Sequence, residues 1–379
     1  MAITGRKLIF IDGLNHTASK KDEVRTSIII PVINEIGVLP GLLNNLQNQI
    51  NASQREVIVS DGGSVDGTLE YLFRYQYQLN YPLVIVHSKI GRATQMNQAA
   101  LIAKGRDLLF IHADTLIYQN NLLHIAEENL DQLRSELKLQ SVAGHFSLSF
   151  LSHRCESVDS SIYYYNEAKT HLNKEDCING DQGMMLSKTF FNQLGMFNTE
   201  LAFMEDARMA TKIFKEGRWI CFPDGMSTSA RRFEVEGFRK RQTINALIRI
   251  FNDIGADDYL RMTENIYRHQ YKASDLKIGP FFSAAHQVSF SRGLNQWAVY
   301  WVKAGIYISR QVWQIFFWFD CIRARGKNKG SGSVDPFWLM FYERNLHWLF
   351  VNPVSCALTS VLSMIWFYMM LAYLILTGR

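Results

Sequence analysis

The N-terminal half of the chain alternates between short apolar runs and helical patterns, and this alternation limits the fold more than any other feature. The run SIIIPV at residues 27–32 is followed by leucines at helical spacing, and EVIVS (56–60), LVIVHS (83–88) and DLLFIHAD (107–114) continue the alternation. These runs are apolar at successive positions, which is typical of strands covered on both faces. The pattern predicts an α/β fold whose sheet is doubly wound and mostly parallel, with helices on both faces.

Polar side chains follow four of these predicted strands in succession. They are Asn34 and Glu35 after the first strand, Asp61 after the second, Gly91 and Arg92 after the third, and Asp114 after the fourth. A single carboxylate at a strand end is usually a helix cap. Because parallel sheets bind ligands at the carboxyl ends of their strands, four such ends together favour a binding site. Neither G-x-G-x-x-G after a strand nor G-x-x-x-x-G-K-[ST] is present, which argues against a dinucleotide fingerprint and a P-loop.

Composition narrows the class of protein further. Apolar residues make up 47% of the 379 residues, which is enough for a large core. The net charge of +5 is mild and argues against a dedicated nucleic-acid binder. The 5 cysteines are scattered without a C-x-x-C pair, which favours reduced thiols in a cytosolic setting over a disulfide framework.

The C-terminal segment is strongly apolar. From Asn345 to Gly378 there is no Asp, Glu, Lys or Arg, and the 22 residues from Ser355 to Leu376 would form a helix of roughly 33 Å. This length matches the hydrocarbon thickness of a bilayer and predicts a single transmembrane helix, although a buried core helix is the alternative. A basic cluster precedes the segment, at Arg323, Arg325, Lys327 and Lys329. The cluster favours an orientation with the N-terminus on the cytoplasmic side.

A second apolar segment at residues 294–319 contains tryptophans and only two charges, Lys303 and Arg310. Tryptophan and basic residues on one helix indicate a segment lying in the membrane interface. Spanning the membrane is disfavoured because both charges would lie deep in the bilayer, and an ordinary packing helix is the alternative. The stretch GKNKGSGSVDP at residues 326–336 is predicted to be a flexible linker.

Several motifs together resemble glycosyltransferase family 2, the inverting enzymes of the GT-A fold. In chain order they are SIIIPVINE, VIVSDGGSVDGT, GRATQMNQAA, LLFIHADT, GDQGMMLSKTFFNQLGMFN, FMEDARMATKIFKEG and TSARRFEVEGF. The last five resemble, more narrowly, one bacterial subgroup of that family. The resemblance covers about residues 26–250 and not the final 100 or so.

The resemblance implies a donor site for a nucleotide sugar. Asp61 matches the acid that hydrogen-bonds the nucleotide base, Glu35 lies in the matching nucleotide pocket, and Arg92 falls where the subgroup has an arginine near the donor. Asp114 matches the last acid of the D-x-D motif, which would hold Mn²⁺ or Mg²⁺ on the sugar diphosphate. His112 replaces the first acid of that motif, so it is either a second metal ligand or a packed strand residue.

The resemblance also implies a catalytic base. Glu205 and Asp206 match the family's acid pair, in which the aspartate usually takes the proton of the attacking hydroxyl. No histidine is near them in the sequence. Asp181 and Gln182 of the GDQG motif would bind the acceptor. The alternative is that the acid pair has only a structural role, in which its negative charge in the first turn of a helix stabilises the helix dipole.

Arg231 opens a basic stretch that continues to Arg241. A planar cation there would neutralise the departing nucleoside diphosphate, whereas a solvated or membrane-facing basic surface is the alternative.

These observations predict four parts: an N-terminal extension (1–25), a GT-A domain (26–255), a helical interfacial region with a linker (256–335), and a membrane anchor (336–379). The expected activity is inverting transfer of a sugar from a nucleoside-diphosphate donor to a lipid-linked or other membrane-proximal acceptor. A polyprenyl-phosphate sugar synthase and a catalytically silent sugar-nucleotide-binding scaffold are the alternatives.

Overall fold

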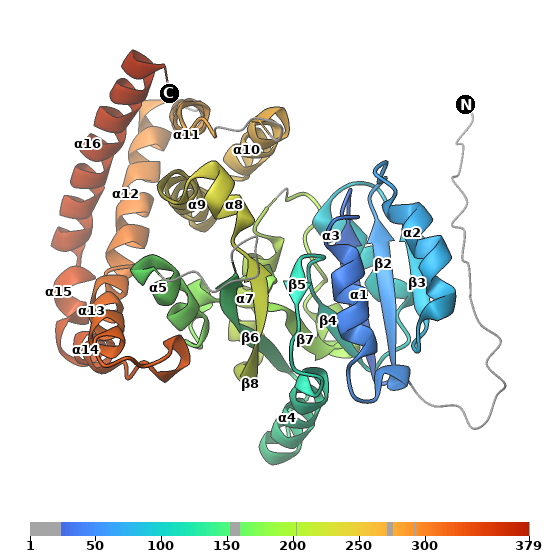
Figure 1. Ribbon diagram of the computed structural model, residues 1–379. Helices are drawn as coiled ribbons and strands as arrows, with labels where there is room; N and C mark the ends of the chain where they lie inside the picture. Colours follow the sequence, from blue (N-terminus) through green and yellow to red (C-terminus); the bar gives the residue numbers. More distant parts are fainter. Residues whose placement is uncertain (1–23, 152–159, 202, 271–275, 292, 379) are drawn as a thin grey trace. The chain divides into compact units, whose positions relative to one another are not determined.

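The computed structural model describes residues 24–151, 160–201, 203–270, 276–291 and 293–378 (Figure 1). Most of the predicted N-terminal extension, residues 1–23, lies outside the described residues. Contacts divide the chain into two compact units. Unit 1 is Met1–Ser157, Lys169–Glu200 and Glu205–Ser229, and unit 2 is Val158–Ala168, Leu201–Met204 and Ala230–Arg379.

Unit 1 is built on a sheet in which the described residues form eight strands in the order β3-β2-β1-β4-β7-β6-β8-β5. The strands are β1 (Thr26–Val32), β2 (Arg55–Asp61), β3 (Leu83–His87), β4 (Asp107–Phe110), β5 (Thr115–Leu116), β6 (Val142–Leu151), β7 (Met184–Ser187) and β8 (Arg218–Ser229). The pairs among β1 to β4 are parallel, as predicted. Strand β7 pairs antiparallel with β4 and β6, and β5 pairs antiparallel with β8, while β6 and β8 run parallel. The sheet formed by the described residues is therefore mixed, with four parallel and three antiparallel pairs.

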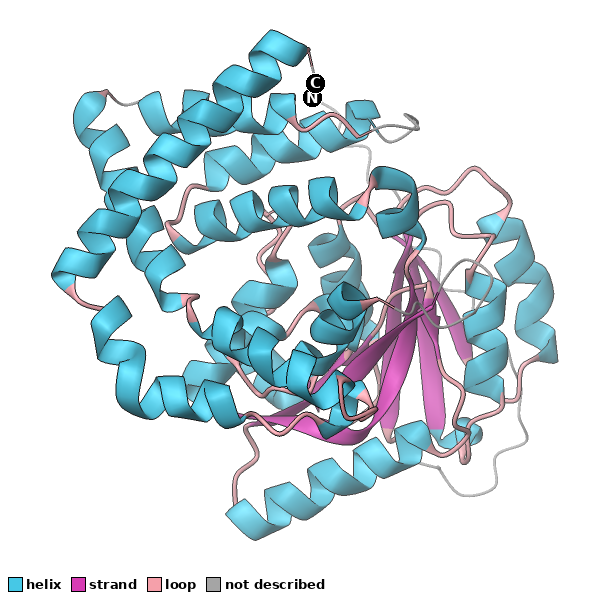
Figure 2. Ribbon diagram, turned by 60° about the vertical axis from the view of Figure 1, so that its left-hand side comes forward, coloured by secondary structure: helices cyan, strands magenta, loops and turns pink. Residues whose placement is uncertain are grey.

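Helices cover both faces of this sheet, as the apolar runs predict (Figure 2). One face packs against α1 (Leu39–Gln47), α2 (Thr68–Tyr75) and α4 (Leu122–Leu137), and the other against α3 (Arg92–Ile102), α6 (Lys188–Gln193) and α7 (Glu205–Glu216). Strand β1 shows why its run is continuously apolar. Ile28 and Ile30 enter the first core and Ile29 enters the second, so successive isoleucines of the run are all buried.

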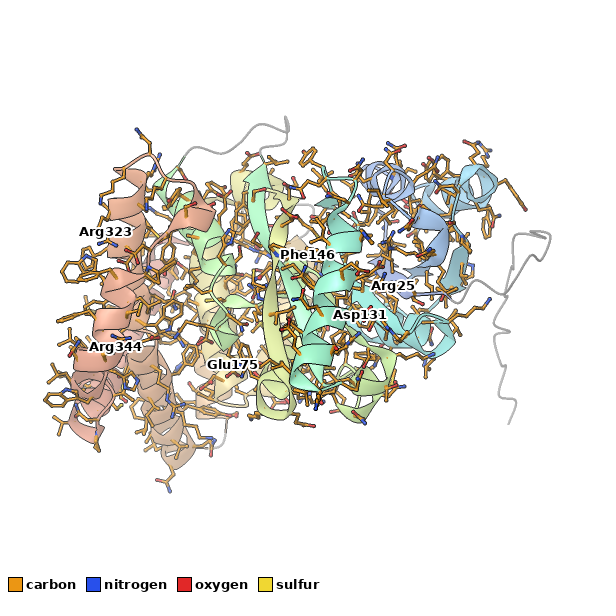
Figure 3. The ribbon with its side chains drawn as sticks, turned by 90° about the horizontal axis from the view of Figure 1, so that it is seen from below. Arg25, Asp131, Phe146, Glu175, Arg323 and Arg344 are labelled. Atoms are coloured by element: carbon orange, nitrogen blue, oxygen red, sulfur yellow. The ribbon has the colours of Figure 1, made fainter. Side chains whose placement is uncertain are left out.

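Charged side chains hold the amino ends of the strands to α4. Arg55 donates to both carboxylate oxygens of the buried Glu127, at 2.7 and 2.8 Å, and Thr26 donates to the same group at 2.7 Å. Arg25 pairs with Asp131 at 2.8 Å (Figure 3). Paired charges therefore fasten the end of the sheet that lies opposite the candidate site.

Unit 2 is helical over its described residues, with its core between α9, α10, α11 and α16. Its helices are α5 (Ser161–Thr170, whose last two residues belong to unit 1), α8 (Arg231–Glu236), α9 (Phe238–Asp253), α10 (Asp257–Gln270), α11 (Gly279–Phe290), α12 (Leu294–Arg310), α13 (Trp313–Arg325), α14 (Phe337–Phe341), α15 (His347–Phe350) and α16 (Pro353–Thr377).

The predicted interfacial segment at 294–319 is not one helix. It comprises α12 and the first part of α13, with a break at Gln311 and Val312. The predicted flexible linker is held in place at two points, because the Tyr164 hydroxyl donates to the Lys329 carbonyl at 2.9 Å and Arg323 pairs with Asp335 at 3.0 Å. These side-chain contacts fix residues 326–336, and composition alone does not reveal them.

The predicted C-terminal helix is present as α16. Asn352 caps it by accepting from the Ser355 N–H at 3.0 Å, and the left-handed Gly378 (φ 65°) ends it. Among the described residues it is the one helix long and apolar enough to cross a membrane, with a mean hydropathy of 1.8, and 22% of its most apolar window is buried. The ability of α16 to cross a membrane is inferred from its length and its composition.

Candidate functional site

The loops after β1 and β2 are joined by hydrogen bonds at the carboxyl end of the sheet. The buried carboxylate of Asp61 accepts from the backbone N–H of Gly63 at 2.8 Å and of Ser64 at 3.1 Å. The Ser64 hydroxyl in turn accepts from the N–H of Asn34 at 2.8 Å. Glu35 follows directly and is half-buried, and its N–H donates to Thr68 Oγ1 at 3.1 Å. Asp61 therefore shapes the turn in which the predicted nucleotide pocket would lie.

The third strand end leads into an ion pair between α3 and α7. Arg92, the first residue of α3, approaches the buried carboxylate of Glu205 at 3.6 Å, and its own side chain is 40% exposed. Burial opposes the charge of Arg92, but the carboxylates of Glu205, Asp206, Asp181 and Asp114 together raise the pKa of the guanidinium. The structure therefore gathers four carboxylates of the predicted site around one cation, Arg92.

Glu205 and Asp206 are adjacent in the sequence but differ in environment. The Glu205 carboxylate is 1% exposed, and neither of its oxygens has a hydrogen-bond partner among the described residues. Burial raises the pKa of Glu205, with Arg92 opposing the shift and Asp206 adding to it. Asp206 is half-buried and accepts from the N–H of Gly180 at 2.5 Å and of Ala207 at 2.7 Å. Asp206 is thus held by two donors in an accessible position, whereas Glu205 is enclosed.

His112 joins the same pocket, although it is far from the acid pair in the sequence. His112 Nδ1 lies 2.7 Å from an oxygen of Asp181, whose side chain is 58% exposed. A small pocket is lined by both His112 and Asp206, together with Gly180 and Glu205. No histidine is near Asp206 along the chain, but in the fold His112 lines the same pocket.

Gly180 lies close to both Asp206 and His112. A methyl group on its Cα would lie 2.7 Å from Asp206 Oδ2 and 3.1 Å from His112 Nε2. Both distances are shorter than ordinary contacts, so a methyl group here would displace the Asp206 carboxylate or the His112 ring.

We expect Gly180→Ala to reduce turnover at least about tenfold while leaving the fold intact, because it displaces the Asp206 carboxylate without removing a charge. The matched control is Gly41→Ala in α1, where a methyl group would meet no atom within 4 Å. Steady-state turnover and thermal melting of both variants check this. Equal turnover in Gly180→Ala and Gly41→Ala would show that the close approach has no functional role.

Asp114 and Gln182 occupy contrasting positions. Asp114 lies just beyond β4, is half-buried, and contributes to the field on Arg92. Gln182 is fully buried and donates to the Cys177 carbonyl at 2.5 Å, so it packs beneath the turn that presents Asp181. Over the described part of the chain, no three His, Cys, Asp or Glu side chains form a group able to hold a metal ion.

Arg231 is the one predicted site residue whose side chain lies outside the described residues. Its backbone opens α8 in unit 2.

Sequence reasoning overlooked Gln95 and Asn97, although both belong to the quoted stretch GRATQMNQAA. Gln95 is buried and donates to the carbonyls of Val32 at 2.8 Å and Ser60 at 2.7 Å, which joins the ends of β1 and β2. Asn97 exchanges two hydrogen bonds with the backbone of Phe197, at 2.8 and 3.1 Å. Amides within an otherwise apolar helix face were the available signal, because a buried amide requires partners.

Comparison with known proteins gives similarity over the first part of the chain. Residues 27–195 match the family model of glycosyl transferase family 2. An uncharacterised glycosyltransferase, YfnE of Bacillus subtilis, is 36% identical over 115 residues, which are 28% of this chain and 29% of the relative. A PGL/p-HBAD biosynthesis glycosyltransferase of Mycobacterium bovis is 35% identical over 98 residues, 26% of this chain and 38% of the relative.

A third relative, the poly(ribitol-phosphate) beta-glucosyltransferase of Bacillus spizizenii, is 31% identical over 129 residues, which are 32% of this chain and 19% of the relative. The chain thus covers well under half the length of these curated relatives.

Among solved structures, S. aureus TarS 1-349 in complex with UDP matches with a TM-score of 0.45 and 17% identity, over 84% of this chain and 91% of that one. The mannosyltransferase PcManGT from Pyrobaculum calidifontis, in complex with GDP-Man and Mn²⁺, matches with a TM-score of 0.45 and 16% identity, over 93% and 91%. The family match and the curated relatives support the assignment of residues 27–195 to glycosyl transferase family 2.

Proposed function

We propose that the protein is an inverting glycosyltransferase that moves a sugar from a nucleoside-diphosphate sugar to a lipid-linked or other membrane-proximal acceptor. The observation that carries this proposal is the cluster of Arg92, Asp114, Asp181, Glu205 and Asp206 in a family 2 domain. One cation among several carboxylates suits a reaction in which a diphosphate departs and a hydroxyl loses a proton. The names of the curated relatives agree with sugar transfer.

We assign the general base to Asp206. An inverting displacement needs a carboxylate on the acceptor side that takes the proton as the hydroxyl attacks the anomeric carbon. Two backbone N–H groups fix the orientation of Asp206, and its side chain is accessible. Glu205 instead has the role of holding Arg92, because its carboxylate is enclosed and lies 3.6 Å from that guanidinium.

The donor would bind along the first three strand ends. Arg92 is 40% exposed and would pair with the diphosphate. Half-buried Glu35 would contact the nucleotide, and buried Asp61 would serve the donor site by holding the turn beneath it. Arg231 is proposed as a second cation for the leaving nucleoside diphosphate.

A divalent metal, Mn²⁺ or Mg²⁺, fits the chemistry of Asp114. Both ions take oxygen ligands, and a single half-buried carboxylate would leave room for diphosphate oxygens and water. When bound, the metal would supply positive charge that stabilises the leaving diphosphate. His112 would not be a ligand through Nδ1, since that atom faces Asp181.

The acceptor would approach past Asp181, whose carboxylate is exposed beside His112. Buried Gln182 would support this turn from beneath rather than touch the acceptor. Membrane attachment through the C-terminal helices, with the catalytic domain on the cytoplasmic side, would bring the enzyme to a lipid-linked substrate. In this arrangement the proposed parts are a transferase domain (26–255), a helical region with a linker (256–335) and the anchor (336–379). Residues 230–255 of the first part belong by their contacts to unit 2.

Two other functions would have different signatures. A polyprenyl-phosphate sugar synthase transfers to a phosphate and needs no strong base, so its turnover would be insensitive to loss of Asp206. A silent sugar-nucleotide-binding scaffold would bind donors without turning them over.

The proposal is tested by incubating the purified full chain with a panel of nucleotide sugars and Mn²⁺ or Mg²⁺, and measuring released nucleoside diphosphate. We expect one donor to be hydrolysed slowly in the absence of acceptor, with release that requires the metal. Tight donor binding without any release, also after addition of a membrane extract, would support the scaffold instead.

A further inference from the structure

Helix α16 packs on unit 2 along one side only. Phe367 stacks on Phe282 of α11 with 5.1 Å between ring centroids, and Leu371 and Leu374 are buried beside it. The remaining sides are exposed and apolar, at Val354, Leu358, Val361, Leu362, Ile365, Trp366, Met369, Tyr373, Ile375 and Leu376. The helix is therefore neither a core helix nor a free-standing span.

Helix α12 runs antiparallel beside α16 (Figure 1). Trp297 Nε1 donates to the Tyr368 hydroxyl at 2.8 Å near one end of the contact. Further along, Gly305 approaches Ser360 so closely that a methyl group on Gly305 would lie 2.0 Å from the serine hydroxyl oxygen. The two helices are thus in close contact along the middle of α16.

The pairing of α12 with α16 places the charged Lys303 of α12 beside the middle of α16. Lys303 is exposed and lies between Trp301, which packs on Phe367 at 5.2 Å, and Gly305, which meets Ser360. If α16 crossed a bilayer, Lys303 would lie near its centre, and α11 and α12 would be carried in with it. An ammonium group at that depth is strongly disfavoured. A bilayer around all sides of α16 therefore conflicts with its packing.

The helices before α16 expose aromatic and basic side chains of the kind found at membrane interfaces. Phe337, Trp338 and Phe341 of α14 and Trp348 of α15 are all exposed, Trp348 by 66%. Lys327 and Lys329 are exposed in the linker before α14, and the guanidinium of Arg323 lies 5.3 Å from the ring centre of Phe337. Figure 3 labels Arg323 of α13 and Arg344, which lies between α14 and α15. Such a surface matches an anionic leaflet, in which tryptophans sit at headgroup depth.

We infer that α16 does not cross the membrane but lies in the cytoplasmic leaflet, with α11 and α12 on its protein side and the linker lysines on anionic headgroups. This inference rests on the membrane attachment in the proposed function and changes its geometry. The C-terminus and the catalytic domain would then be on the same side of the membrane.

The sidedness of the two chain ends tests this directly. The full chain carries one epitope before Met1 and another after Arg379, and sealed inverted vesicles and intact spheroplasts are treated with protease. We expect both epitopes to be digested in inverted vesicles and both to survive in spheroplasts. Epitopes on opposite sides would overturn the in-plane arrangement and leave membrane attachment standing. Recovery of the protein in the soluble fraction without detergent would overturn both the in-plane arrangement and the membrane attachment. Sugar transfer is assayed separately, so that loss of the proposed enzymatic function can be told apart from loss of attachment.

Vesicle binding provides an independent test. Leu358→Glu combined with Met369→Glu puts charge into the exposed side of α16 and should reduce binding to phosphatidylglycerol–phosphatidylcholine vesicles by about tenfold or more. Tyr77→Glu is the matched control, since Tyr77 is 68% exposed in unit 1 and Met369 is 69% exposed. Lys327→Gln with Lys329→Gln should weaken binding to the anionic vesicles and leave binding to neutral ones unchanged. Equal loss in the control, or no loss in either pair, would contradict the assigned surface.

Discussion

Asp206→Asn is expected to lower turnover by about 10² to 10⁴, the usual contribution of a general base, with donor affinity nearly unchanged. The substitution keeps the size of the side chain and one oxygen that can accept from the Gly180 N–H. It removes the proton acceptor. Acceptor turnover and nucleotide-sugar binding, measured on the same preparations, separate these two effects.

Two further variants locate the base within the pocket. Glu205→Gln should cost less turnover than Asp206→Asn and should weaken donor binding, because Glu205 holds Arg92. His112→Asn tests the imidazole that Asp181 orients. If His112→Asn abolished turnover while Asp206→Asn stayed near normal, the base would be the histidine.

Asp114→Asn is expected to abolish the metal dependence of donor binding and to reduce activity by at least about 10². The amide retains a carbonyl oxygen but lacks the charge that holds a divalent cation. Donor titrations with and without Mn²⁺ measure the change, and Asp258→Asn serves as the control because Asp258 is 56% exposed in unit 2, paired with Arg261. Full activity of the wild-type enzyme in excess chelator would make Asp114 a structural or hydrogen-bonding residue instead.

The sequence was most informative where local patterns determine structure. The continuous apolar runs predicted β1 to β4 and their burial on both faces, because each run supplies residues to both cores. The mixed half of the sheet was not predictable in this way. Strands β6 and β8 pair in parallel although β7 lies between them in the sequence, and such a choice depends on distant packing.

In the site, too, some features follow from local sequence patterns and others depend on contacts between distant residues. Strand-end position and the family resemblance identified Arg92, Asp114 and the acid pair, which the structure brings together. The sequence could not show which member of the pair is enclosed, since that depends on where α7 begins against α3. The approach of His112 to Asp181 joins residues 69 positions apart, beyond the reach of any local pattern.

For the C-terminal region, composition identified the apolar helix but not its neighbours. A hydropathy pattern describes α16 alone, whereas the contacts with α11 and α12 place Lys303 beside its middle. Those contacts are the basis of our inference that α16 lies in one leaflet and does not cross the membrane.

The most direct test of the account is transfer itself. Labelled sugar from the donor identified in the nucleotide-sugar panel is incubated with wild-type enzyme, metal and a membrane lipid extract, and the lipid-extractable label is counted. We predict label in the lipid fraction, bound with the anomeric configuration opposite to that of the donor, and a loss of about 10² or more with Asp206→Asn. Transfer with retention of configuration, or equal labelling by wild-type and Asp206→Asn, would contradict an inverting mechanism with Asp206 as its base.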